Sequence, residues 1–201
     1  MDPAVGLVQS YLRLNGFFTV TEYPVVATAR DGTHTLTDAD ILAVRFPAAE
    51  RWVPGLGREP DISLATDERL RLSTAMLDMI IGEVKEGKPH LNETVFWEPV
   101  IESVVRRFGC CEKSPAETAR SVLQSGHADT LVGGMPCHIR MVIFGGTSFR
   151  DSKHFEVIPL DHILRFVHGH IEQHRDIFLH TQLKDDALDL MALMVKLGVH
   201  I

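Results

Sequence analysis

The chain has 201 residues, of which 45% are apolar and 23% charged, and its formal net charge is −7. This length suits a single domain, 1–201, with a substantial core. No apolar run approaches the roughly 18 residues of a membrane-spanning helix, and the first residues lack the pattern of a secretory signal. The three cysteines give neither a disulfide framework nor a metal-ligand spacing. We therefore expect a cytoplasmic protein without membrane contact.

The acidic balance argues against avid binding of duplex nucleic acid. Acids outnumber lysine and arginine by 27 to 20, whereas nucleic-acid binders gain much of their affinity by neutralising phosphates. The compact basic groups are the short pairs Arg69/Arg71 and Arg106/Arg107. A nucleic-acid partner would therefore have to depend on local charge.

The first half of the chain predicts one helix and three strands. Asp2 and Pro3 form a typical helix start, which predicts a helix over 3–15. Residues 17–26 and 39–46 read as strands, separated by a polar turn region at 29–37. Residues 47–77 predict a long excursion with a short helix near 67–75, and loops of that length are often functional. A third strand follows over 79–85.

The second half predicts further helices around two strands. Helices are expected over 98–108 and from the capping box of Ser114 and Glu117 to Gly126. Strands are expected over 138–144 and 155–159, followed by a helix from Asp161 to about 178 and a last helix over 184–197. Strands interleaved with helices predict an α/β fold with a central mixed sheet flanked by helices. The core would span about 1–160 and the C-terminal helices about 161–201.

Three polar residues at strand ends form the candidate site. Glu83 and Lys85 are two residues apart in a predicted strand, so their side chains project to the same face. Asp40 opens the preceding strand. Mg²⁺ typically takes one or two carboxylates, and a lysine beside them can stabilise developing negative charge. The Val84 backbone carbonyl is a further candidate ligand.

This order of elements resembles the PD-(D/E)xK nuclease superfamily, which has the restriction-endonuclease-like fold. The family core is a helix, a strand, a strand with the aspartate, a strand with acid-x-lysine, a helix and a strand. The resemblance covers roughly the first 145 residues and makes the C-terminal helices an elaboration. It implies that Asp40 and Glu83 hold Mg²⁺ or Mn²⁺ and that Lys85 assists attack by water on a phosphodiester.

The chain departs from the family pattern in its acids. Some members add a glutamate from the first helix, but this helix has no acid after Asp2, so the position is empty unless Glu22 on the first strand substitutes. Asp38 competes with Asp40, and we prefer Asp40 because it directly precedes the apolar run. The segment between Asp40 and Glu83 is also longer than in the simplest members.

Other motifs are weaker. His170 and His174 are spaced for one helix face, but without the HExxH order or a third ligand we expect exposed helix histidines rather than a zinc site. His90 is expected in a loop. The glycine pairs at 133–134 and 145–146 are expected in turns, and Cys137 is expected to be a buried structural thiol.

Two hypotheses remain open. The first is a metal-dependent phosphodiesterase acting on nucleic acid. The second is a non-catalytic binding or assembly protein on the same fold with a vestigial site. The last helix is apolar on more than one side, which indicates either a core helix or a homodimer contact.

Overall fold

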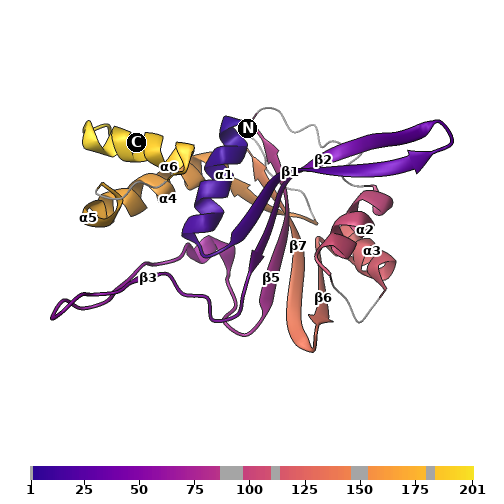
Figure 1. Ribbon diagram of the computed structural model, residues 1–201, viewed down its shortest axis with the longest axis horizontal. Helices are drawn as coiled ribbons and strands as arrows, with labels where there is room; N and C mark the ends of the chain where they lie inside the picture. The colour runs from indigo at the N-terminus through magenta and orange to yellow at the C-terminus, as the bar shows by residue number, and fades with distance from the viewer. Residues whose placement is uncertain (1, 87–96, 110–113, 146–153, 180–183) are drawn as a thin grey trace.

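The structure is a computed structural model that describes residues 2–86, 97–109, 114–145, 154–179 and 184–201. It is a mixed α/β fold in which a curled mixed sheet is flanked by helices (Figure 1). The strands are β1 (Phe18–Ala29), β2 (Gly32–Arg45), β3 (Trp52–Val53), β4 (Ile62–Ser63), β5 (Leu77–Lys85), β6 (His127–Val132), β7 (Met135–Gly145) and β8 (Glu156–Pro159). The helices are α1 (Pro3–Leu14), the 3₁₀-helix η1 (Glu68–Leu70), α2 (Glu98–Arg107), α3 (Pro115–Ser125), α4 (Leu160–Gln173), α5 (Arg175–Phe178) and α6 (Asp186–Lys196).

The main sheet combines antiparallel and parallel pairing. Its strand order is β1-β2-β5-β7-β6, and β8 also pairs with β7. β1, β2 and β5 are antiparallel neighbours, whereas β5, β7 and β8 run parallel. Between β5 and β7 the chain passes through α2, α3 and β6, because parallel strands need a crossover connection. The prediction of a central mixed sheet flanked by helices is confirmed.

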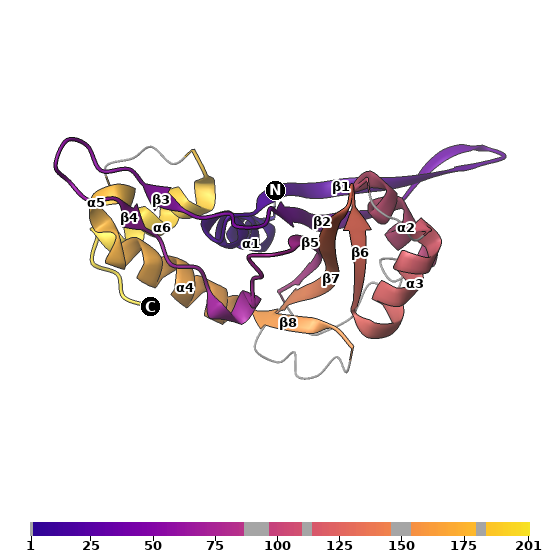
Figure 2. The same cartoon turned by 90° about the horizontal axis from the view of Figure 1, so that it is seen from below.

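Helices cover both faces of this sheet (Figure 2). Alternate residues of β5 point to opposite faces: Ile80 packs into the cluster formed with α1, α4 and α6. Met79 and Ile81 pack into a second cluster, formed with α2 and α3. Because Met79, Ile80 and Ile81 are apolar and point to alternate faces, the middle of β5 has the continuous apolar run seen in the sequence.

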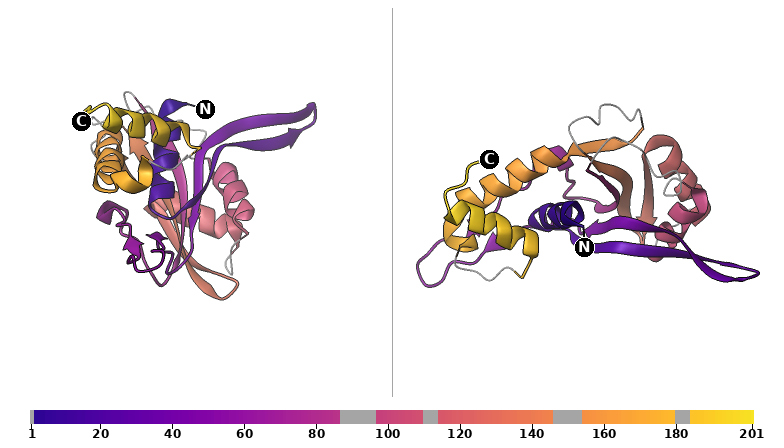
Figure 3. Two further views of the ribbon diagram at one scale, coloured as in Figure 1. Left: turned by 60° about the vertical axis from the view of Figure 1, so that its left-hand side comes forward. Right: turned by 90° about the horizontal axis from the view of Figure 1, so that it is seen from above.

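The long β1–β2 hairpin differs from the prediction. Its strands pair as far as Ala29 and Gly32, so the connection is only Arg30 and Asp31. The expected turn region at 29–37 is therefore wrong, and β2 begins at Gly32, whose φ of +134° suits a glycine. The outer part of the hairpin projects from the body of the molecule (Figure 3).

Other local predictions held or failed for identifiable reasons. Asp2 caps α1, and the capping box at the start of α3 is formed as predicted. The 47–77 segment contains the small β3–β4 sheet and η1, rather than a helix over 67–75. The helix expected to continue to 178 breaks at His174, where α4 ends and α5 begins. β6 was not predicted. In the described part of the chain, no helix is both long and apolar enough to cross a membrane.

Candidate metal centre

Asp40 and Glu83 lie opposite each other on neighbouring strands. The antiparallel pairing of β2 with β5 runs to Ile41 and Gly82, so the next position in register brings Asp40 to Glu83. Directly opposed residues of an antiparallel pair point to the same face. The two carboxyl groups are close enough to hydrogen-bond to each other when one is protonated. The structure therefore brings together the two acids that the sequence singled out.

Asp40 is held by the backbone of β5. Its Oδ2 accepts a hydrogen bond from the Val84 N–H at 2.7 Å. Burial raises the pKa of the Asp40 carboxyl, although this hydrogen bond and the charge of Lys85 act in the opposite direction. In an extended strand the N–H and C=O of one residue point to the same side. The Val84 carbonyl therefore faces the side on which Asp40 lies, as a backbone ligand would have to.

Glu83 is buried and only half satisfied. Its side chain is 2% exposed, and its Oε1 is 2.5 Å from Lys85 Nζ. The other oxygen, Oε2, is buried and has no hydrogen-bond partner within the described ranges. Burial raises the pKa of Glu83, and the nearby charge of Asp40 adds to this, whereas contact with Lys85 lowers it. A buried carboxylate oxygen without a donor is costly unless a cation binds it.

An open cavity of about 470 Å³ lies beside this pair, and its lining is acidic. The lining residues are Asp2, Val5, Glu22, Asp38, Asp40, Val84, Lys85 and Glu86. Both additional acids considered from the sequence, Glu22 and Asp38, are thus present. Asp2 is present as well, and its charge contributes to raising the pKa of Asp40. Five carboxylates against one lysine make this cavity attractive to a cation.

Glu22 reaches the cavity through an irregularity in β1. The pairs Thr21–Ile41 and Tyr23–Ala39 place Glu22 opposite Asp40, but Glu22 itself is outside the ladder and has a φ of +51°. Such a conformation is uncommon for a residue other than glycine and is often found near functional sites. The sequence pattern around Asp2 predicts only a helix cap. Its hydrogen bonds to Ala4 and Val5 confirm that cap, and only the approach of α1 to the strand ends shows its second position.

The donor set suits a hard divalent cation. Two carboxylates and one backbone carbonyl would offer oxygen ligands, and Mg²⁺ commonly completes such a set with waters. The unpartnered Glu83 Oε2 would be an acceptor open to such a cation. Among the described residues, no group of three or more histidine, cysteine, aspartate or glutamate side chains is arranged to hold a metal. Any cation would therefore depend on the carbonyl and on water.

The histidines of α4 do not match the prediction. His170 is buried rather than exposed, and its ring packs against Phe166, His174 and Phe178. The prediction failed because the face of α4 that carries His170 turns toward the core cluster around Phe178. The Nε2 atoms of both His170 and His174 have no hydrogen-bond partner in the described parts of the chain.

His90 lies outside the described residues, and Cys137 is buried as expected, with its thiol pKa raised to about 12.

We expect the burial of His170 to make the folded protein less stable in acid. Burial, together with the nearby charges of His174 and Arg51, lowers the pKa of His170 to about 4. Because the unfolded chain binds a proton near pH 6.5, stability should fall as pH drops from about 6.5 toward 4, by roughly 3 kcal/mol for this residue alone. Urea unfolding across this pH range measures the fall.

His170→Leu should reduce this pH dependence, whereas the exposed His200→Leu should leave it unchanged. An equal slope in all three proteins would contradict the assignment.

Comparison of the chain with protein-family models, with curated proteins and with solved structures gave no match.

Proposed function

We propose that the protein is a metal-dependent phosphodiesterase acting on nucleic acid, built on a restriction-endonuclease-like fold. The observation that carries the proposal is the opposed pair of Asp40 and Glu83 with Lys85 in contact with Glu83. The order of the main elements supports the fold: α1, β1, β2 with Asp40, β5 with Glu83 and Lys85, α2, and then β7 parallel to β5, with the short β3, β4 and η1 before β5 and with α3 and β6 before β7. This is the order that the family resemblance implies.

Each residue has a distinct part in the proposed reaction. Asp40, Glu83 and the Val84 carbonyl would hold Mg²⁺ or Mn²⁺, with Glu22 and Asp38 as additional acids at the cavity. A bound divalent cation supplies Lewis acidity and lowers the pKa of its water. Lys85 assists the attack by water, since its ammonium lies at the carboxylate pair and can stabilise negative charge that grows on the phosphoryl group.

A non-catalytic binding or assembly protein on this fold is the second candidate. Glu83 is 2% exposed and does not itself line the cavity, so a cation in the cavity reaches it only after a local rearrangement. The acidic lining also repels phosphate.

A homodimer through α6 stays a prediction: Leu188, Met191, Ala192 and Val195 face the core, whereas Leu190, Leu193 and Leu197 are exposed.

Two measurements on the purified protein test the proposal. Labelled single- and double-stranded DNA and RNA are incubated with Mg²⁺ or Mn²⁺, and with EDTA as the control. We expect cleavage that EDTA abolishes. In parallel, a cation at 100 times its Kd should stabilise the fold by about 2.7 kcal/mol.

The Asp40→Asn variant should lose both effects, and the matched variant Asp31→Asn, at the tip of the hairpin, should keep them. Stabilisation without cleavage would favour the binding protein. If the wild type showed neither cleavage nor stabilisation by the cation, a metal centre would be refuted.

A further inference from the structure

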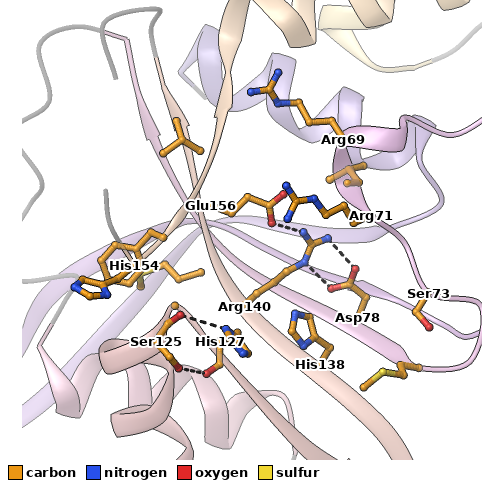
Figure 4. Close-up of a pocket in the computed structure, with 16 residues that line it drawn as sticks. Arg69, Arg71, Ser73, Asp78, Ser125, His127, His138, Arg140, His154 and Glu156 are labelled. Atoms are coloured by element: carbon orange, nitrogen blue, oxygen red, sulfur yellow. Dashed lines mark hydrogen bonds and ion pairs between the residues drawn. The ribbon is translucent and has the colours of Figure 1, made fainter. Parts of the chain in front are cut away.

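A second cavity, of about 800 Å³, lies at the junction of β6, β7 and β8 (Figure 4). It opens where β7 changes partners: His127 of β6 pairs with Arg140, and Glu156 of β8 pairs with Val142. Gly126 lies in this gap with a φ of +81°, and a Cβ there would be 1.9 Å from the His154 carbonyl oxygen. The wall between α3 and β8 therefore depends on close backbone approach.

This cavity is separate from the Asp40–Glu83 pair. Asp78, which lines it, precedes Glu83 by five residues on β5, a separation of roughly 17 Å along a strand. An odd separation also places the two side chains on opposite faces of the sheet. The inference below is therefore independent of the proposed function.

The floor of the cavity is a buried ion-paired network. Arg140 is 5% exposed and donates to Asp78 through Nε at 3.0 Å and Nη2 at 2.8 Å, and to Glu156 through Nη1 at 2.6 Å. These bonds engage both acids that line the cavity. A guanidinium has five N–H groups, so within the described ranges two of those of Arg140 are left for a ligand. Because both carboxylates hold it, this arginine is fixed in place.

The rim of the cavity carries positive charge, and no acidic side chain in the described ranges forms an ion pair with it. Arg69 and Arg71 line the cavity, and neither side chain has an acidic partner among the residues that the structure describes. Arg71 has a φ of +48°, and Figure 4 shows its side chain directed toward the Arg140–Glu156 pair. With neutral histidines, three arginines and two acids give the lining a net charge of +1, in a chain whose net charge is −7.

Histidine side chains complete the lining with further hydrogen-bonding groups. His127, His138 and His154 all border the cavity, and the rings of His127 and His138 lie 5.4 Å apart between centroids. Small-molecule sites typically have volumes of 300–1,000 Å³ with a few convergent polar groups. Guanidinium groups match the geometry of phosphate oxygens. Arginines on two elements, η1 and β7, suit a tetrahedral anion with oxygens in several directions.

We propose that this cavity binds a phosphate group, either free or as the monoester of a small organic molecule up to the size of a mononucleotide. Arg69 and Arg71 hold the phosphate at the rim, and Arg140 donates from the floor. Any organic part of the ligand lies along His127 and His138.

Titration calorimetry in low salt with EDTA tests this proposal, using inorganic phosphate, AMP and acetate as probes. We expect phosphate or AMP to bind with a Kd below about 1 mM and acetate to bind at least tenfold more weakly. Tighter binding of AMP would identify the monoester, and equal binding would identify free phosphate. The double variant Arg69→Gln/Arg71→Gln should weaken binding at least tenfold.

The matched control Arg30→Gln/Arg58→Gln removes the same charge at two exposed positions away from the cavity and should leave binding unchanged. No binding of phosphate or AMP at 10 times the expected Kd would overturn the proposal. An equal loss in both double variants would do the same, because it would indicate nonspecific attraction.

Discussion

Replacement of Lys85 with alanine is expected to lower the kcat of cation-dependent cleavage by about 10²- to 10⁴-fold while cation binding is retained. Lys85 Nζ is 2.5 Å from Glu83 Oε1, so its charge lies at the carboxylate pair rather than in bulk solvent. The side chain is not itself a metal ligand. Its loss should therefore lower kcat, and it should lower to the same extent the rate constant of cleavage measured under single-turnover conditions with saturating Mg²⁺. KM and the cation Kd should change much less.

Two further variants separate catalysis from structure. Lys196→Ala removes an exposed lysine at the end of α6 and should leave cleavage unchanged. Glu83→Gln removes a carboxylate from the same pair and should weaken the cation Kd as well as cleavage. If Lys85→Ala weakened cation binding as much as Glu83→Gln does, Lys85 would act only as a partner that positions Glu83. If cleavage were unchanged in Lys85→Ala, the proposed role would be wrong.

The pairing of Asp40 with Glu83 could be predicted because it follows from local periodicity. Two apolar runs in succession favour neighbouring strands, and the two-residue repeat then fixes which side chains share a face. The approach of Asp2 and Glu22 could not be predicted in the same way. The position of Asp2 depends on where α1 packs on the sheet, and that of Glu22 depends on a backbone irregularity that its sequence does not mark.

The fold shows the same division. Elements with strong end signals, such as α1 after Asp2 and α3 after Ser114, were predicted closely. β6 was missed because it is short and largely exposed or half-buried, so that it lacks an apolar pattern. The hairpin was misjudged because most of β2 before Ala39 is exposed. A strand held mainly by pairing with its neighbour leaves little hydrophobic signal in the sequence.

The network around Arg140 is the feature farthest from any sequence signal, and it should have a large effect on stability. Its members come from β5, β7 and β8, and they meet only through parallel pairing of distant segments. Asp78→Ala would leave the Arg140 guanidinium buried with one of its two carboxylates gone. Breaking a buried ion pair in this way typically costs 3–5 kcal/mol, which equilibrium urea unfolding at pH 7 would measure.

A double variant that replaces both Asp78 and Arg140 is the control for this prediction. Asp78→Leu combined with Arg140→Met removes the two most buried charges of the network together and leaves Glu156, whose side chain is 25% exposed. Buried pairs replaced by apolar side chains are often close to neutral in stability. We therefore expect the double variant to be more stable than Asp78→Ala. Asp129→Ala, which removes the exposed partner of His138, should cost less than about 1 kcal/mol. An ion pair in contact with water contributes little to stability, so removing one partner costs little free energy of unfolding. If Asp78→Ala cost no more than Asp129→Ala, Asp78 and Arg140 would therefore not be the desolvated pair that their burial indicates.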